Sequence, residues 1–481
     1  MKKIISILLL LILVLIGIIS FRTLTATNYQ RNIKASPAPQ LSDSALLHFQ
    51  QAISYKTISY ADAKDWDSVP FLHFRTFLET TYPLVHQHLA REIVNNYTLV
   101  YKWQGSDHAL APYILMAHQD VVPIEEDTKK QWTFEPFSGT IKDGYIWGRG
   151  TTDDKINLIS IFESAEKLLQ QNFQPKRSIY FVFGHDEEIG GNHGAVRVAK
   201  LFKERNIKAD LVLDEGGILT KEKIPGLTKP VALIGTAEKG YLTLKFSVNK
   251  KGGHSSQPEN ETAVDILTKA LVTLRANPFE PKFVEASQDF MKYLGPEMKF
   301  PNNMAFANLW LFRPLVVNKF EQQAASNAMM RTTAVPTIIN AGIKDNVVPT
   351  LATAIVNFRL LPGDSSTYII KKVQEIIEDN RVIVQPYDEN ISEASATTPT
   401  TSAAFQLIDS VVRKSYDSIS TAPFLLIGAT DSRHFNQIST NIIKFSPMLD
   451  PIGFHGINER VSIESFRHAI WFYEQLLGSC K

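Results

Sequence analysis

Short apolar runs alternate with segments of helical periodicity over much of the chain. The runs are typical of buried strands, and the periodic segments of helices that bury one face. Expected strands are 98–103, 113–117, 179–183 and 211–213, and expected helices are 44–53, 71–89, 156–169 and 194–205. Alternation of strands and helices predicts an α/β fold with a mostly parallel, helix-covered sheet.

The pattern changes at Lys239. Residues 241–248 and 353–360 alternate between apolar and polar side chains, as antiparallel strands with one solvated face do. Expected helices are 262–274 and 367–378. The α/β pattern then resumes with a helix at 403–415, strands at 424–427 and 442–445, and a last helix after Ser462, whose hydroxyl is a natural N-cap. We therefore expect a main domain of residues 43–238 and 396–481, with an inserted α+β domain at 239–395.

The N-terminus carries the longest apolar run. Met1-Lys2-Lys3 precedes residues 4–21, which are broken only by Ser6, Gly17 and Ser20. The run approaches the ~20 residues that span a bilayer and exceeds a usual signal-peptide core, and Leu24-Thr25-Ala26 is a poor cleavage site. We expect residues 1–26 to be a signal anchor, with a cleaved signal peptide as the alternative.

The flanking lysines set the expected orientation of this segment. They favour a cytoplasmic N-terminus with the remainder exported to the periplasmic or extracellular side. Residues 27–42 are polar with two prolines and are interpreted as a stalk. If the segment is cleaved, the protein is secreted instead.

Composition restricts the classes of function. A chain of 481 residues exceeds one ordinary core, so two domains are expected. The formal net charge of +1 argues against a nucleic-acid partner. Cys480 is the only cysteine, so the chain has no internal disulfide and relies on its core and on bound metals.

Metal-type side chains follow several of the apolar runs. His118 follows residues 113–117, Glu188 follows 179–183 and Asp214 ends the run at 211–213. Open α/β sheets bind ligands beyond the carboxyl ends of their strands. A single acidic residue at a strand end is usually a turn or cap, but several clusters in order favour one metal centre.

The side chains suit two zinc-like ions that share a carboxylate. We expect His118 and Asp214 to hold one ion and Glu188 and His455 the other, with Asp153 as the bridge. Glu187 is placed to take the proton from the attacking water, and Asp120 to accept the other ring N–H of His118 and fix its tautomer.

With these motifs the chain resembles the aminoacylase and carboxypeptidase S family of co-catalytic zinc peptidases, from about Ser42 to Leu477. The motifs are His118–Pro123, Gly148–Lys155, Asp186–Gly191, Asp214–Gly217, Gly252–Ser256 and Asn346–Pro349. The resemblance implies a zinc exopeptidase fold, the same ligand roles with Glu187 as general base, and two zinc ions per subunit, with manganese or cobalt as alternatives.

Three segments point to the carboxypeptidase S branch, which includes the N-fatty-acyl-amino-acid synthase/hydrolase. They are Asp214–Gly217, Gly428–His434 and His455–Arg460. One departure is Ile156-Asn157, where many members have glycine.

Arg359 is the first candidate for binding substrate. It follows the alternating strand, and a guanidinium holds a carboxylate with two parallel hydrogen bonds. The alternative is a surface ion pair at a strand edge. Arg433 is a second candidate.

The inserted domain carries two further candidates. The resemblance implies that His254 comes from the lid of a partner subunit, or from a closing lid, to polarise the scissile carbonyl, with Asn346 assisting. A homodimer through the lid is therefore expected. The Phe- and Met-rich residues 279–312 are either extra lid core or an apolar wall for an acyl chain.

These observations predict a di-zinc hydrolase that cleaves an amide bond next to a free-carboxylate amino acid. Its substrate is a small peptide or an N-acyl amino acid, and the reaction runs in either direction. A non-catalytic, membrane-tethered binding protein is the alternative, but the complete ligand set argues against it. An aminopeptidase needs an amine site, and Arg359 and Arg433 argue against that.

Overall fold

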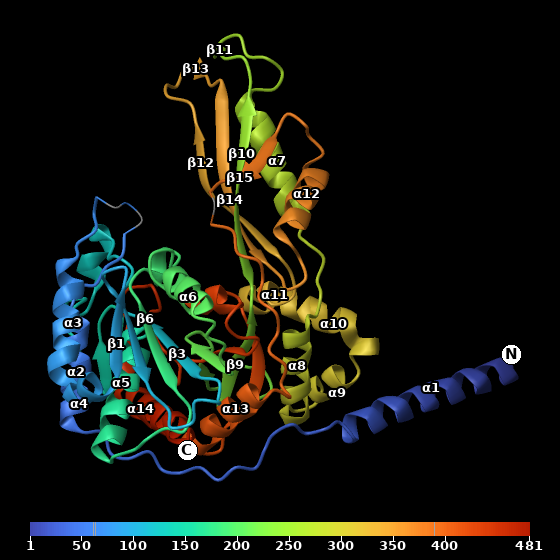
Figure 1. The fold of residues 1–481 in the computed structure, drawn as a ribbon. Coiled ribbons are helices and arrows are strands. Elements are labelled where there is room, and N and C mark those ends of the chain that lie inside the picture. The colour runs from blue at the N-terminus through green and yellow to red at the C-terminus, as the bar shows by residue number, and fades with distance from the viewer. Residues whose placement is uncertain (61, 63, 389) are drawn as a thin grey trace.

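A computed structural model describes residues 1–60, 62, 64–388 and 390–481, and its main domain is built on a nine-stranded sheet (Figure 1). The strand order is β1-β2-β6-β3-β7-β17-β9-β16, with β8 beside β9. The central neighbours β6, β3, β7 and β17 pair in parallel. The strands are β1 (Ala90–Val94), β2 (Thr98–Trp103), β3 (Tyr113–His118), β6 (Ile179–Gly184), β7 (Leu211–Asp214), β8 (Leu219–Thr220), β9 (Val231–Glu238), β16 (Ser420–Leu426) and β17 (Ile442–Lys444).

Helices cover both faces of this sheet, as predicted. Alternate residues of β3 face the two cores: Leu115 and Ala117 pack in the larger one, and Ile114 and Met116 in the smaller. The larger core is covered by α2 (Asp43–Ser54), α3 (Val69–Thr81), α4 (Pro83–His88), α5 (Lys155–Gln170), α13 (Ala403–Ser415) and α14 (Ile463–Gly478), and the smaller by α6 (Ala195–Glu204) and η4 (Asp431–Phe435). The predicted helix at 71–89 is split because Pro83 starts a new helix.

The inserted domain is a second sheet of order β12-β14-β10-β15, covered by two helices. Its elements are β10 (Gly240–Asn249), α7 (Ala263–Ala276), β12 (Thr333–Ala341), β14 (Leu351–Leu360), α12 (Ser366–Ile377) and β15 (Ile383–Pro386). The chain returns beside its entry, where Ser395 N donates to Glu238 O at 3.1 Å. A small ribbon of β11 (Gly253–His254) and β13 (Val347–Val348) forms the tip of this lid (Figure 1).

The Phe- and Met-rich stretch does not pack as lid core. Phe290, Leu294 and Met298 belong to the core of the main domain, and only Phe279 joins the lid core. The stretch forms α8 (Glu285–Leu294), η3 (Gly295–Glu297), α9 (Asn302–Ala307), α10 (Leu309–Glu321) and α11 (Ala324–Ala328). Most of its side chains are thus structural, on a different domain from the one expected.

A small three-stranded sheet flanks the sites of Asp153 and His455. It comprises β4 (Thr140–Lys142), β5 (Tyr145–Trp147) and β18 (Arg460–Ser462). The 3-10 helices η1 (Glu126–Gln131) and η2 (Glu187–Ile189) complete the main domain. Asp153 follows β5, and His455 precedes β18, so pairing of these strands brings two distant loops together.

The N-terminal segment forms α1 (Lys2–Leu24), whose 23 residues are long and apolar enough to cross a membrane. None of it is buried, and it projects away from the body (Figure 1). This helix is compatible with a signal anchor or a signal peptide.

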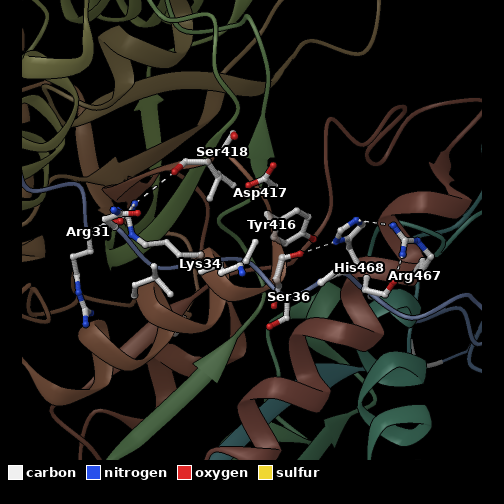
Figure 2. A pocket seen from close by; sticks show the side chains of 16 residues that line it. Arg31, Lys34, Ser36, Tyr416, Asp417, Ser418, Arg467 and His468 are labelled. Atoms are coloured by element: carbon white, nitrogen blue, oxygen red, sulfur yellow. Dashed lines mark hydrogen bonds between the residues drawn. The ribbon is translucent and has the colours of Figure 1, made fainter.

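Residues 27–42, the expected stalk, instead run along the main domain. Ser36 N donates to Lys414 O at 2.8 Å, and Trp471 Nε1 donates to Ser36 O at 3.0 Å. Figure 2 shows Arg31, Lys34 and Ser36 beside Tyr416 and His468 of the main domain.

Candidate metal centre

Asp153 lies between two histidines at the carboxyl ends of β3, β6 and β7. Its Oδ1 is 2.9 Å from His118 Nε2, and its Oδ2 is 2.7 Å from His455 Nε2. Each oxygen of one buried carboxylate therefore faces a different imidazole. This is the arrangement of a carboxylate that bridges two cations.

Two glutamates complete the two sides. Glu188 Oε2 lies 3.2 Å from His455 Nε2, and Glu215 Oε1 lies 3.5 Å from His118 Nε2. Ligand atoms of His118, Asp153 and Glu188 also lie within 4.8 Å of one another. One group of possible metal ligands is therefore His455 with Glu188, and the other is His118 with Glu215.

Asp214, the expected partner of His118, does not approach its ring nitrogens within 4.0 Å. Its Oδ2 accepts a hydrogen bond from Ser432 N at 2.8 Å. Within the described part of the chain, the carboxylates that approach His118 within 4.0 Å are those of Asp120, Asp153 and Glu215. The geometry therefore differs from the sequence prediction by one residue, because the chain turns directly after β7.

Asp120 organises the site behind His118. Its backbone carbonyl lies 3.0 Å from His118 Nδ1, and its Oδ1 lies 3.4 Å from the same atom. The carboxylate also accepts hydrogen bonds from the backbone N–H groups of Glu187 at 3.2 Å and Glu188 at 3.1 Å, and from Ser59 Oγ at 2.5 Å. Asp120 therefore fixes the ring orientation of His118, chiefly through its backbone carbonyl, and its carboxylate holds the backbone that carries the base.

A buried ion pair joins the loops that carry Asp153 and His455. Arg149 Nη1 lies 2.5 Å from Glu459 Oε2, and Arg149 Nη2 donates to His455 O at 3.2 Å. Glu459 Oε1 accepts from the backbone N–H groups of Gly150 at 3.0 Å and Thr152 at 2.8 Å. The sequence motifs contained both residues, but their contact was not predicted.

The centre holds more buried negative charge than its histidines balance. Burial and the nearby Asp153 raise the pKa of Glu188 to about 7 and that of Glu215 to about 8. Hydrogen bonds to Asp153 and Glu188 raise the pKa of His455 to about 10. Glu188 Oε1 is buried and lacks a hydrogen-bond partner among the described residues. This donor set fits divalent cations, which compensate such charge and occupy such oxygens.

The base candidate Glu187 and the two arginine candidates are all half-buried. Burial raises the pKa of Glu187 well above its usual value, against the field of His118. Burial lowers the pKa of Arg359. The charge of Arg433 lowers it further, whereas the charge of Glu187 raises it. The Arg359 guanidinium lies 4.8 Å from the ring centre of Tyr241, and Arg433 Nη2 donates to Gly190 O at 3.0 Å. Arg433 is thus held on the loop that carries Glu187, and the charge of Glu187 acts on Arg359.

His254 and Asn346 lie away from the centre. Both are exposed, and Ser255 N donates to Asn346 O at 3.2 Å, so the two residues share the lid tip. Figure 1 shows this tip at the end of the lid remote from β3 and β6. The single chain in this conformation does not bring them to the metal side chains.

Comparisons with known proteins agree with this geometry. A family model described as peptidase family M20/M25/M40 matches residues 114–479. A probable carboxypeptidase S-like protein of Dictyostelium discoideum is 43% identical over 446 residues, covering 91% of this chain and 85% of that protein. An N-fatty-acyl-amino acid synthase/hydrolase of Xenopus tropicalis is 36% identical over 479 residues, covering 97% and 93%. The crystal structure of an M20 family metallo-carboxypeptidase from Sulfolobus solfataricus shares the fold, with a TM-score of 0.66, 17% identity and coverage of 91% and 99%.

Proposed function

The chain belongs to peptidase family M20/M25/M40, and on this premise we propose that it uses two zinc ions to hydrolyse an amide bond next to a free-carboxylate amino acid. Membership makes the chain a metal-dependent hydrolase and argues against the non-catalytic binding protein. The observation that carries the two-metal proposal is Asp153, whose two oxygens face His118 and His455 separately.

The proposed ligand set follows the contacts. His118 and Glu215 hold one ion, Glu188 and His455 hold the other, and Asp153 bridges them. Two imidazoles and three carboxylates are typical zinc ligands, although manganese and cobalt accept the same donors. Glu215 replaces Asp214 in this set because Asp214 is already engaged by Ser432.

The metal ions, Glu187 and Asp120 have separate roles in the proposed hydrolysis. Bound metal ions supply a water of lowered pKa and polarise the scissile carbonyl. Glu187 accepts a proton from the water that attacks the carbonyl carbon, and delivers it to the amine nitrogen as the C–N bond breaks. Asp120 holds the Glu187 backbone in place for both transfers. The same steps in reverse join an amine to a carboxylate.

The substrate class rests on Arg359 and Arg433. A carboxypeptidase and an N-acyl-amino-acid hydrolase share one feature, a free carboxylate beside the bond that is broken. Both relatives carry the names of enzymes of this kind. The two guanidiniums near Glu187 supply the matching positive charge. We therefore propose dipeptides, peptide C-termini and N-acyl amino acids as substrates.

Amidation of the substrate carboxylate is the test of this class. The wild-type enzyme is expected to cleave an N-acyl amino acid and to leave its C-terminal amide intact. Arg359→Lys keeps the charge but loses the paired hydrogen bonds, so its kcat/KM falls by roughly tenfold. Arg381→Lys, in an exposed lid ion pair, is the matched control and should change nothing. Equal cleavage of acid and amide by the wild type contradicts the assignment.

The remote lid tip requires a further proposal. His254, assisted by Asn346, stabilises the oxygen of the reacting carbonyl. Because the tip lies away from its own centre, the lid of a partner subunit supplies His254 in a homodimer, or the lid closes over its own chain.

We also propose a place for the protein in the cell. α1 anchors it in a membrane, and the charge of Lys2 and Lys3 leaves the body on the exported side. Cleavage after α1 gives the secreted alternative.

A further inference from the structure

An apolar face of α10 is uncovered beside the base of α1. Trp310 is 54% exposed, Leu311 37% and Leu315 66%, and Phe300, in the turn before α9, is 74% exposed. Positions 310, 311, 314 and 315 lie on one side of a helix. Large apolar side chains gathered in this way mark a contact surface rather than scattered exposure.

α1 is attached to the main domain where α9 meets α10. The buried Asn308 donates from Nδ2 to Ile19 O at 3.3 Å and to Thr23 Oγ1 at 3.1 Å. Arg22 Nε donates to Ala307 O at 3.4 Å. Figure 1 shows α1 leaving the body beside α9 and pointing away from it. The depth of α1 in a bilayer therefore sets the depth of α9 and α10.

The length of α1 gives that depth. Its 23 residues extend about 34 Å, slightly more than the ~30 Å hydrocarbon core of a bilayer. Ile19 lies five residues before the end at Leu24, or about 7 Å along the axis. Interfacial elements bury their apolar face by ~5–10 Å at the boundary of headgroups and acyl chains. The contact of Asn308 with Ile19 thus places the start of α10 at this level.

The segment after α1 keeps the body from moving away. Asn28 Nδ2 donates to Glu297 Oε1 at 3.0 Å, the Tyr29 ring stacks on Tyr293 at 4.9 Å, and Gln30 Nε2 donates to Tyr293 O at 3.0 Å. The chain then continues along the main domain past Arg31 and Ser36 (Figure 2). A free polar stalk would let the distance between the domain and the end of α1 vary, whereas this docked segment fixes that distance.

We infer that Phe300, Trp310, Leu311 and Leu315 insert into the interfacial layer of the membrane that α1 spans, so that the protein contacts the bilayer at two places. The inference rests on the proposed anchor. Aromatic side chains favour this layer, and the exposed Lys299 and Lys319 lie within four residues of Phe300 and Leu315 in the sequence, so their charges can reach lipid phosphates.

Lipid-borne quenchers test the contact directly. The full chain is reconstituted in phosphatidylcholine and phosphatidylglycerol vesicles whose acyl chains carry bromine close to the headgroup. The wild type should lose tryptophan fluorescence relative to unbrominated vesicles. In Trp310→Phe more than half of this loss should disappear, because phenylalanine keeps the face apolar but removes the reporter. Trp66→Phe is the control, since Trp66 stacks on Phe71 in the main domain, and its quenching should match the wild type.

Flotation of the same vesicles separates the two claims. Protein that fails to float overturns the anchor and the inference with it. Protein that floats, but whose quenching is unchanged by Trp310→Phe, overturns the inference alone. A second copy of the chain on this face gives that second result. Hydrolysis of a soluble substrate reports on the proposed activity separately from both outcomes.

Discussion

Glu187→Gln is expected to retain the metal ions and to lose ~10²–10⁴-fold in kcat, the usual cost of removing a general base. Glutamine keeps the size of the side chain but accepts no proton at neutral pH. The backbone N–H of Glu187 still bonds to Asp120, so the neighbouring ligand Glu188 stays in place. Turnover and metal content of the purified variant are the two measurements.

Glu188→Gln is the matched control for this experiment. It alters the adjacent residue by the same atoms, yet it weakens a ligand beside His455 and should lower metal content. Near-wild-type turnover in Glu187→Gln contradicts the assignment of the base.

His254→Ala is expected to lower kcat by ~10²–10³-fold with metal content unchanged, as removal of a donor to the reacting oxygen does. The residue is exposed at the lid tip, so its loss should leave the fold intact. His73→Ala, at an exposed position of α3, is the control and should keep full activity. Full activity in His254→Ala refutes the role.

Mixing two inactive variants distinguishes the partner's lid from a closing lid. When Glu187→Gln and His254→Ala subunits are exchanged, a mixed dimer has one centre with an intact base and an intact partner lid. Activity should therefore return if the lid acts across the dimer. A mixture that stays inactive shows that each lid serves its own chain.

Strands of the main sheet were predictable because their apolar runs are short, buried and bounded by polar turns. The prediction of residues 98–103 matches β2, and 113–117 differs from β3 only by the addition of His118. Alternation likewise indicated β10 and β14, whose apolar positions pack in the lid core, although Thr243, Ser247 and Ile355 on the other face are buried as well. These are cases in which local pattern and tertiary environment agree.

The identity of the carboxylate near His118 was not predictable from its position in the sequence. Asp214 and Glu215 are adjacent, and both follow the same apolar run. β7 ends at Asp214, and Gly216 at φ 128° turns the chain, so the Glu215 side chain reaches the centre. The backbone turn, rather than the residue type, selects between the two.

Two larger features depend on tertiary contacts. Residues 279–312 carry abundant apolar side chains, but no local signal says whether they pack on the lid or on β16. Residues 27–42 have the composition of a linker, yet they dock through side chains such as Asn28 and Gln30 and through the backbone of Ser36, and composition does not reveal these contacts. Ser36 is held through its N–H and C=O alone.

The central claim is that Asp153 bridges two metal ions held by His118 with Glu215 and by Glu188 with His455. Zinc content per chain, measured during titration of metal-free protein and followed together with activity, tests it most directly. The account predicts full activity at two equivalents, about one tightly bound equivalent in Glu215→Ala, and two in Asp214→Asn. Full activity with one zinc ion or none, or loss of an ion in Asp214→Asn but not in Glu215→Ala, would contradict it.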